Sequence, residues 1–457
     1  MTLVSDAQRI FRAGVSAVDP ARAVRRNLAR RGSVFRVGTG SLHIAPEGTI
    51  RLVAIGKAAG AMLDAASEIV GEGFEAVMVT PRGYPGSAEG LPTKFGEHPV
   101  PGAGSFRAGR ALLEFVKRAR TGDLVIFLIS GGGSAVAEVP AAPLSDADLR
   151  RTTAVLLASG APIGAMNAIR RHLSGIKGGR LAAAVTGATF GTLALSDVAG
   201  DAPEDIASGP TAPDPSTFRD ALQVVREFDL AHRLPARVID HLGRGSRGKL
   251  AETPKPGDPR LRGAPFVLVG SNSLALRAAE RRAQSQGYRV EVIPRPVVGE
   301  TRPAAVRFAR RLLRYRGGSP RALLAGGETT VVLGARPGRG GRNQEFALST
   351  ARVLAGRDAV VLSAGTDGVD GPTDAAGGWV DGRSWRRASA RGADLPRALA
   401  SHASYDALEQ LGSLFKTGPT GTNVMDLHVG LVVSPANRGT GGSTKRDAAP
   451  SSRRRRS

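Results

Sequence analysis

The feature that most constrains the fold of this chain is an alternation of short apolar runs with longer segments of helical periodicity. The runs expected to form strands are 52–55, 77–80, 124–129, 191–195, 266–269, 290–293, 322–325, 331–333 and 360–363. Helix-length segments between them include 58–70, 106–119, 146–159 and 274–286. Strands that alternate with helices in this way predict α/β layers built on parallel strands.

A length of 457 residues corresponds to two or three domains. We predict a first domain over 1–245 and a second over 266–435. Between them, 246–265 is polar and rich in Gly, Pro and Arg, which is typical of a linker outside the core. The tail, 436–457, is rich in Gly, Ser and Arg, and we expect it to be disordered.

Several classes of protein are excluded by what the sequence lacks. There is no cysteine, so disulfides, thiolate zinc sites and iron–sulfur clusters are excluded. No apolar run approaches the roughly 18 residues of a membrane span, and no signal peptide is recognisable. We therefore expect a cytoplasmic protein that is not in a membrane.

The net charge of +23 raises the question of nucleic-acid binding. The two ends, 1–36 and 436–457, each carry a surplus of six positive charges, about half of the total. No zinc finger, basic heptad region or aromatic RNA-binding motif accompanies them, so we do not expect nucleic acid to be the main ligand. The Arg-rich start also resembles a mitochondrial presequence, but Ile10, Phe11, Val15 and Val18 fall on one face of an amphipathic helix.

Two Gly-containing loops follow expected strands and could hold an anion. Lys57 comes directly after the strand 52–55 and Gly56, where the carboxyl ends of parallel strands form a ligand crevice. A second loop follows the strand 124–129, and its backbone N–H groups could surround a phosphate. Its candidate nucleotide-binding residues are Ser130, Gly131, Gly132, Gly133 and Ser134. The alternative for Lys57 is a solvated loop lysine, and the alternative for the second loop is a plain tight turn.

Carboxylates follow two other strands. Asp197 lies after the strand 191–195, and Asp367 lies after the strand 360–363 in a loop dense in Gly, Thr and Asp. Carboxylate oxygens suit Mg²⁺, so both are candidate metal ligands. Asp197 could instead accept a proton from a substrate hydroxyl, and either residue could simply cap a turn.

Two segments of the second predicted domain add further polar candidates. Glu328 lies in Gly-Gly-Glu-Thr-Thr, and Arg342 lies in Gly-Gly-Arg-Asn-Gln-Glu just before a helical run. A guanidinium on a Gly-rich loop offers a planar fork to a phosphate or a carboxylate. No Walker loop, G-x-G-x-x-G or G-x-S-x-G pattern is present, which weakens P-loop, nicotinamide and α/β-hydrolase interpretations.

Taken in order, these motifs resemble the glycerate 2-kinase family over roughly 5–433. The segments that carry the resemblance are 96–101, 130–135, 167–180, 195–201, 340–345, 365–374 and 416–423. The resemblance implies a larger Rossmann-like α/β/α domain and a smaller α/β domain called MOFRL, with the active site in the cleft between them.

The resemblance also implies an activity, which is the ATP- and Mg²⁺-dependent phosphorylation of D-glycerate to 2-phosphoglycerate. The catalytic lysine of the family falls on Lys57 and its catalytic arginine on Arg342. Asp197 is a third catalytic candidate, and Glu328 a nucleotide-binding one. The alternatives are a hydroxypyruvate reductase and a kinase for another small 2-hydroxy acid. A homodimer is possible.

Overall fold

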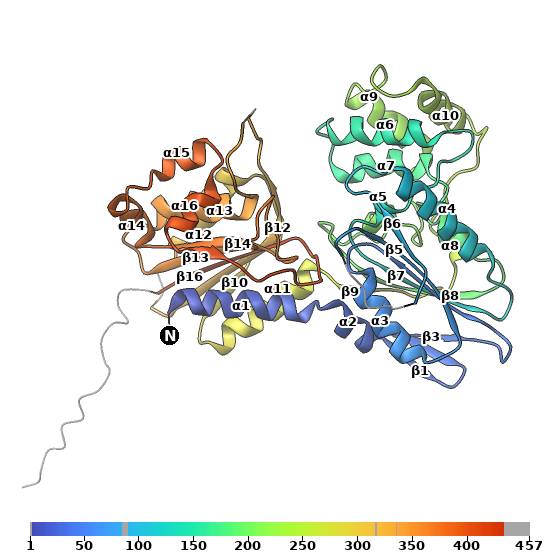
Figure 1. Cartoon of the computed structure of the whole chain (residues 1–457), viewed down its shortest axis with the longest axis horizontal. Helices are drawn as coiled ribbons and strands as arrows, with labels where there is room; N and C mark the ends of the chain where they lie inside the picture. The colour runs from blue at the N-terminus through green and yellow to red at the C-terminus, as the bar shows by residue number, and fades with distance from the viewer. Residues whose placement is uncertain (1, 85–89, 316–317, 335, 434–457) are drawn as a thin grey trace, which may run out of the picture.

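Two β-sheets, each covered by helices on both faces, organise the chain (Figure 1). The computed structural model describes residues 2–84, 90–315, 318–334 and 336–433. The predicted α/β class, with a larger domain and a smaller one, is confirmed. In the described residues, no helix has both the length and the apolar character needed to cross a membrane.

The sheet of the first domain is entirely parallel and has the strand order β6-β5-β4-β7-β8-β9. Its strands are β4 (Ile50–Ile55), β5 (Phe74–Pro81), β6 (Thr93–Gly96), β7 (Leu124–Ile129), β8 (Thr189–Leu195) and β9 (Phe266–Gly270). Because all run the same way, the loops that follow β4, β7 and β8 meet at one edge of the sheet.

The central strands of this sheet are buried on both faces. Along β4, Leu52 and Ala54 pack into the core on one face, and Val53 and Ile55 into the core on the other. The first face carries α2 (Pro20–Asn27) and α3 (Ala59–Val70), with β1 (Leu28–Arg31), β2 (Val34–Val37) and β3 (Gly40–His43) as a small antiparallel sheet beside them. The second carries α4 (Ala103–Lys117), α5 (Gly133–Val136) and α8 (Arg180–Ala183).

A group of helices with its own apolar core extends the first domain at the carboxyl end of the sheet (Figure 1). Its members are α6 (Asp146–Leu157), α7 (Ile163–Leu173), α9 (Phe218–Glu227) and α10 (Ala236–Ser246). The short η1 (Ile206–Ser208) contacts α5 and α7. Of these helices, α6 and α7 line one side of the cavity described below.

The second sheet is mixed and has the order β10-β12-β16-β13-β14-β15, with β11 also paired to β12. Its strands are β10 (Arg289–Val292), β11 (Val297–Glu300), β12 (Arg321–Thr330), β13 (Ala359–Gly365), β14 (Gly377–Asp381), β15 (Leu414–Phe415) and β16 (Asp426–Val432). The strand expected over 331–333 is wrong. β12 ends at Thr330, where its pairing with β11 also ends, and Val332 is 79% exposed.

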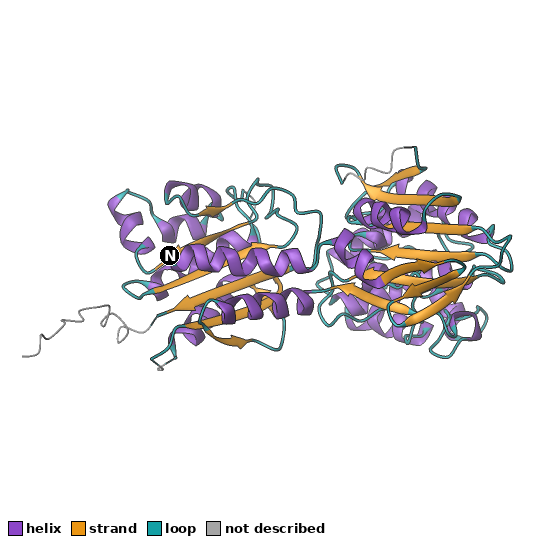
Figure 2. Ribbon diagram, turned by 90° about the horizontal axis from the view of Figure 1, so that it is seen from below, coloured by secondary structure: helices purple, strands orange, loops and turns teal. Residues whose placement is uncertain are grey.

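Helices also cover both faces of this sheet. One face packs against α12 (Thr301–Leu313), α13 (Arg342–Leu354), α14 (Ser384–Ala390), α15 (Leu395–Ala400) and α16 (Ser404–Gln410). The other packs against α11 (Asn272–Ser285) and α1 (Leu3–Ala17). The amphipathic helix expected near the N-terminus is therefore confirmed, but it lies on the second sheet (Figures 1 and 2). Ile10 and Phe11, both buried, pack there with Ala275 and Ala279.

The packing departs from the predicted domain boundaries in three places. The helix α1 belongs with the second domain, and β9 pairs with β8 at the edge of the first sheet. The expected linker packs on the first domain and includes η2 (Pro259–Leu261). Thr253 is buried there and donates a hydrogen bond to Asp214 (2.9 Å). The predicted disordered tail, 436–457, lies outside the described residues.

Candidate active site

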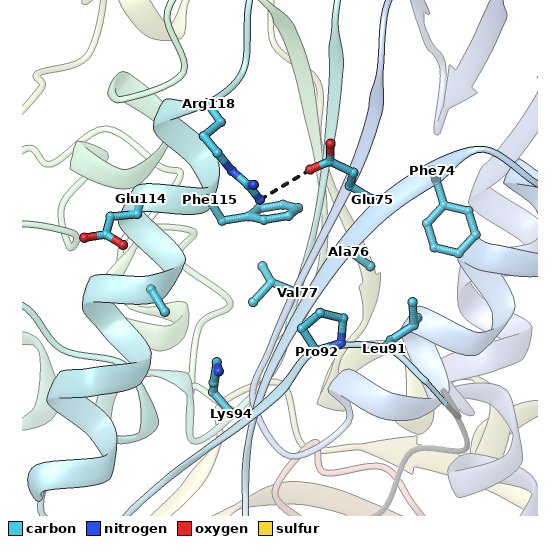
Figure 3. Close-up of a pocket in the computed structure, with 11 residues that line it drawn as sticks. Phe74, Glu75, Ala76, Val77, Leu91, Pro92, Lys94, Glu114, Phe115 and Arg118 are labelled. Atoms are coloured by element: carbon cyan, nitrogen blue, oxygen red, sulfur yellow. Dashed lines mark ion pairs between the residues drawn. The ribbon is translucent and has the colours of Figure 1, made fainter.

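A cavity of about 740 Å³ lies where the two domains meet. The first domain lines it with residues from the loops after β7 and β8 and from α6 and α7, and the second with residues of β11 and β12. Another hollow, of about 500 Å³, lies between β5 and α4 (Figure 3). That hollow is walled by Val77, Leu91 and Phe115, and the ion pair across it joins Arg118 to Glu75 (3.3 Å). Of the sequence-predicted residues, Gly132, Ser134, Asp197 and Glu328 line the inter-domain cavity, whereas Lys57, Arg342 and Asp367 are not among its lining residues.

Lys57 follows the end of β4 and lies beside Gly132, a lining residue of the cavity on which a Cβ would be 3.2 Å from Lys57 Cγ. Its backbone N–H donates to the carbonyl of Gly131 (2.9 Å), which ties the loop after β4 to the loop after β7. Gly56 has φ +114°, and a Cβ there would lie 2.4 Å from the carbonyl oxygen of Ser130, so only glycine fits. Within the described residues, the Lys57 ammonium makes no hydrogen bond or salt bridge, and it lies 5.6 Å from the centre of the Tyr84 ring.

The loop after β7 divides into a structural part and a cavity-facing part. Ser130 is buried, and its Oγ accepts a hydrogen bond from the Ala58 backbone N–H (3.0 Å) and donates to the Ile55 carbonyl (3.2 Å). It holds the two loops together and is not part of the cavity lining, whereas Gly132 and Ser134 are. Of the five residues predicted to bind the nucleotide, two thus line the cavity, and Ser130, Gly131 and Gly133 do not.

Asp197 is packed tightly against this loop. A Cβ on Gly131 would lie 2.0 Å from Asp197 Oδ2, so the glycine makes room for the carboxylate. Burial raises the pKa of Asp197, against the opposing effect of the Lys57 charge and of the Gly132 backbone N–H. The Gly132 N–H thus interacts with Asp197, although the sequence suggested a phosphate as its partner.

The second domain contributes a guanidinium held by two carboxylates. Arg342, the first residue of α13, donates from Nε and Nη2 to Asp426 (2.7 and 2.9 Å), and its Nη1 lies 2.9 Å from Glu328 Oε1. Burial opposes the charge of Arg342, but Asp426 and Glu328 hold its pKa above the usual value. Burial also raises the pKa of Glu328, although Arg342 counteracts it.

Asp367 and Asp370, from the loop after β13, have different surroundings. The Lys57 and Arg342 charges both act on Asp367, whose pKa burial raises. Asp370 is buried at the start of α13 and accepts the backbone N–H groups of Asn343 (3.0 Å) and Gln344 (2.8 Å). Asp370 therefore caps the helix that begins with Arg342, while Asp367 is the one whose carboxylate shares an electrostatic environment with Lys57.

Known families and known proteins are similar to this chain over most of its length. The domain of unknown function DUF4147 matches 6–243, and the MOFRL family matches 321–426. A glycerate 2-kinase of Pyrococcus horikoshii is 38% identical over 435 residues, covering 94% of this chain and 97% of that protein. The D-glycerate 2-kinase of Thermotoga maritima is 39% identical over 436 residues, covering 93% and 97%. This chain belongs to the glycerate 2-kinase family.

The fold agrees with that membership. The crystal structure of the Thermotoga maritima glycerate kinase superposes with a TM-score of 0.79 at 37% identity, covering 94% of this chain and 99% of that one. A relative from Agrobacterium vitis, 38% identical over 435 residues and covering 93% of each chain, carries a provisional name, hydroxypyruvate reductase. The resemblance found in the sequence is confirmed.

Several residues at the site of this glycerate 2-kinase family member were not singled out from the sequence. Asp426 is fully buried at the first position of β16, where a carboxylate before an apolar strand was the available signal. His98 lines the cavity, and burial followed by the Lys57 charge lowers its pKa to about 4. Arg170 and Lys177 also line it. Both residues lie in the segment 167–180 that carried the family resemblance. The chain has many Arg and Lys residues, and nothing in the sequence marked these two as lining a cavity.

Proposed function

We propose that this protein transfers the γ-phosphate of ATP to the 2-hydroxyl of D-glycerate and releases 2-phosphoglycerate. The observation that carries the proposal is that two cations from different domains each adjoin a residue that lines one cavity. Lys57, in the loop after β4, lies beside Gly132, and Arg342, at the start of α13, pairs with Glu328 (2.9 Å); Gly132 and Glu328 both line the cavity. The names of the relatives at 38–39% identity support the same reaction.

Phosphoryl transfer depends mainly on positioning and on stabilising the charge of the transferred group. The Lys57 ammonium, which makes no hydrogen bond or salt bridge in the described residues, would donate to the γ-phosphate. The Arg342 guanidinium would face the same group from the other domain in an orientation fixed by Asp426. Asp197, whose pKa burial raises and so makes it a better proton acceptor than an ordinary carboxylate, would orient the attacking hydroxyl and accept its proton.

The residues at this site fit Mg²⁺. Asp197, Glu328 and Asp367 each interact electrostatically with Lys57, and carboxylate oxygens are the donors that Mg²⁺ prefers. In the described part of the chain, no group of three or more His, Cys, Asp or Glu could hold a metal ion by itself. One or two of these carboxylates would therefore hold the ion, together with the phosphates and water. When bound, Mg²⁺ would neutralise charge on the phosphates.

The adenine base requires an apolar surface, and exposed apolar side chains of the cavity lining would provide one. Leu157 of α6, Ile163 of α7 and Val298 of β11 line the cavity and are 45%, 44% and 55% exposed. Large apolar side chains left open in a cavity mark a ligand-binding surface. We assign the base to this region because it spans both domains, so that nucleotide binding would draw them together.

The proposal includes a cellular location and an oligomeric state. A cytoplasmic location fits a reaction that uses ATP, and a homodimer stays a prediction that size-exclusion chromatography with light scattering would test.

The function is tested by incubating the purified protein with ATP, Mg²⁺ and D-glycerate and resolving the products by ³¹P NMR. A 2-phosphoglycerate signal that depends on all three supports the proposal. Absence of any phosphoglycerate, with NADH-dependent reduction of hydroxypyruvate by the same preparation, would overturn it in favour of the reductase. Phosphorylation of another 2-hydroxy acid in preference to D-glycerate would keep the kinase and change its acceptor.

A further inference from the structure

The inter-domain cavity has two electrically different regions. Around Lys57, three carboxylates, those of Asp197, Glu328 and Asp367, outnumber the lysine. The wall formed by α7 and the loop after it instead presents Arg170 and Lys177 to the cavity. The Asp205 carboxylate also lines the cavity here, but its charge is paired with Arg171 (3.0 Å). A single acceptor molecule that carries both a hydroxyl and a carboxylate has a preferred orientation in such a field.

The cations of this wall share one carboxylate. Lys177 is only 2% exposed and contacts Glu138. The Glu138 carboxylate also accepts hydrogen bonds from Ser174 Oγ (2.5 Å) and from the Val139 backbone N–H (3.0 Å). Glu138 therefore has most of its acceptor capacity in use.

Arg170 shares the favourable charge of Glu138 with Lys177. In the described residues, its guanidinium makes no hydrogen bond or salt bridge, although it lines the cavity and is partly buried. Burial lowers the pKa of Arg170, and the charge that opposes this effect is that of Glu138, which Lys177 already contacts. A partly buried guanidinium with unsatisfied donors is stabilised by an anion, and its planar fork matches a carboxylate.

We propose that Arg170, beside Lys177, binds the carboxylate of the hydroxy-acid acceptor and determines its specificity. The proposal rests on the proposed function and deepens it by naming the residue that recognises the acceptor. With its carboxylate on Arg170, the acceptor would turn its hydroxyl away from the cationic wall and toward Asp197. The carboxylates around Lys57 repel a second carboxylate, so the reverse orientation is disfavoured.

The test compares Arg170→Gln and Arg170→Lys with the wild type, and uses Arg150→Gln as the matched control. Arg150 is exposed on α6 and is not part of the cavity lining. We expect KM for D-glycerate to rise about 10- to 100-fold in Arg170→Gln, as a charged hydrogen bond is lost, with KM for ATP unchanged. The KM of Arg170→Lys for D-glycerate should lie between the values of the wild type and of Arg170→Gln. The KM of Arg150→Gln should equal that of the wild type. Circular dichroism and thermal unfolding check that each variant is folded.

Two outcomes would overturn the proposal. A raised KM for ATP with an unchanged KM for D-glycerate would assign the cationic wall to the phosphates of the nucleotide. Two unchanged KM values in a folded Arg170→Gln would make Arg170 a structural residue.

Calorimetry separates the failure of this proposal from the failure of the kinase reaction. D-Glycerate, D-lactate and glycerol are titrated into the wild type and into Arg170→Gln. Binding of the two carboxylates but not of glycerol, lost in the variant, supports the proposal even if no phosphoglycerate forms. Binding that the variant retains, or no binding of D-glycerate to the wild type, contradicts it.

Discussion

The two domains hold their principal cations in opposite ways. Lys57 stands on a loop packed by glycines, and its ammonium has no hydrogen bond or salt bridge in the described residues. Arg342 begins a helix, and its guanidinium is held by the carboxylates of Asp426 and Glu328. The first domain thus offers a cation whose donors are available, and the second domain a cation whose orientation is fixed in advance.

The difference indicates that the two domains have different roles in phosphoryl transfer. An unpaired ammonium can follow the phosphate as its charge redistributes, because three donors rotate on a flexible stem. A guanidinium locked by two carboxylates can act only where its domain places it, so its contribution depends on how closely the domains approach. The predictions below test this division, from the largest effect to the smallest.

Replacing the free cation should have the largest effect. We expect Lys57→Met to lower kcat by about 10³-fold or more, because the charge on the transferred phosphoryl group loses its principal donor. The measurement is the rate of phosphoglycerate formation. Lys117→Met, in the last turn of α4 and exposed, is the control and should leave the rate unchanged. A Lys57→Met enzyme with more than a tenth of the wild-type kcat would remove the lysine from the mechanism.

The locked cation is tested with Arg342→Lys, which keeps the charge and removes the planar fork. We expect kcat to fall about 10²-fold while KM changes little, because a lysine cannot contact Asp426 and Glu328 together. Arg339→Lys is the control, since Arg339 is half exposed and pairs with Asp406 and Glu409. An unchanged kcat with only a raised KM would show that Arg342 binds substrate without acting on the transition state.

Asp197 should set the acid side of the pH profile. Only its ionised form accepts a proton, and burial raises the pKa of Asp197, so kcat should fall with decreasing pH at a higher pH than an ordinary carboxylate would give. We expect Asp197→Asn to lower kcat by about 10²-fold and to lose that acid limb. The exposed Asp240→Asn is the control. An Asp197→Asn variant that kept the wild-type limb would assign it to another carboxylate.

The smallest effects are expected at two carboxylates that cap helices, Glu97 at the start of α4 and Asp370 at the start of α13. Glu97 accepts the backbone N–H groups of Gly104 (3.1 Å) and Ser105 (2.9 Å) at the start of α4. Burial acts against these hydrogen bonds, but they still hold the pKa of Glu97 at about 2. For Asp370, burial raises the pKa to about 6, against the hydrogen bonds from Asn343 and Gln344.

The two caps should therefore respond to pH in opposite directions. The stabilisation from Glu97 is complete above the usual carboxyl pKa of 4.5 and is lost as pH falls toward 2. The folded state binds the Asp370 proton more tightly than the unfolded state does, so wild-type stability gains as pH falls from about 6 toward 4.

Thermal unfolding of the two cap variants measures these effects. Glu97→Gln should lower Tm by about 1–3 °C at pH 6, and by less as pH falls below 4.5. The deficit of Asp370→Asn relative to the wild type should grow as pH falls through 6. The exposed Glu72→Gln is the control. Differences that did not depend on pH would mean that charge has no part in either cap.

Much of this molecule could be predicted from the sequence, because the relevant signals are local. The apolar run 124–129 became β7 with the same bounds, and Lys57 and Asp197 follow strands as expected. What could not be predicted depends on distant parts of the chain. Periodicity shows that α1 has an apolar face, but the sheet that it covers is decided by packing with α11.

The same limit applies to the candidate site. The tight fit between Gly131 and Asp197 and the pairing of Arg342 with Asp426 join residues far apart in the sequence. Ser130 was expected at the ligand, yet its hydroxyl links two loops. Arg170 could not be separated by residue type from the many exposed arginines, because only the folded chain shows that it lines a cavity.

The central claim is that Lys57 and Arg342, from different domains, act on one anion. A double-mutant cycle with Lys57→Ala, Arg342→Ala and both together, read as kcat/KM for D-glycerate, tests it most directly. If both cations stabilise the same transition state, the double variant should lose little more than the more damaged single variant. If instead the fold losses of the two single variants multiply in the double variant, the cations act independently and the account of a shared phosphate site is contradicted.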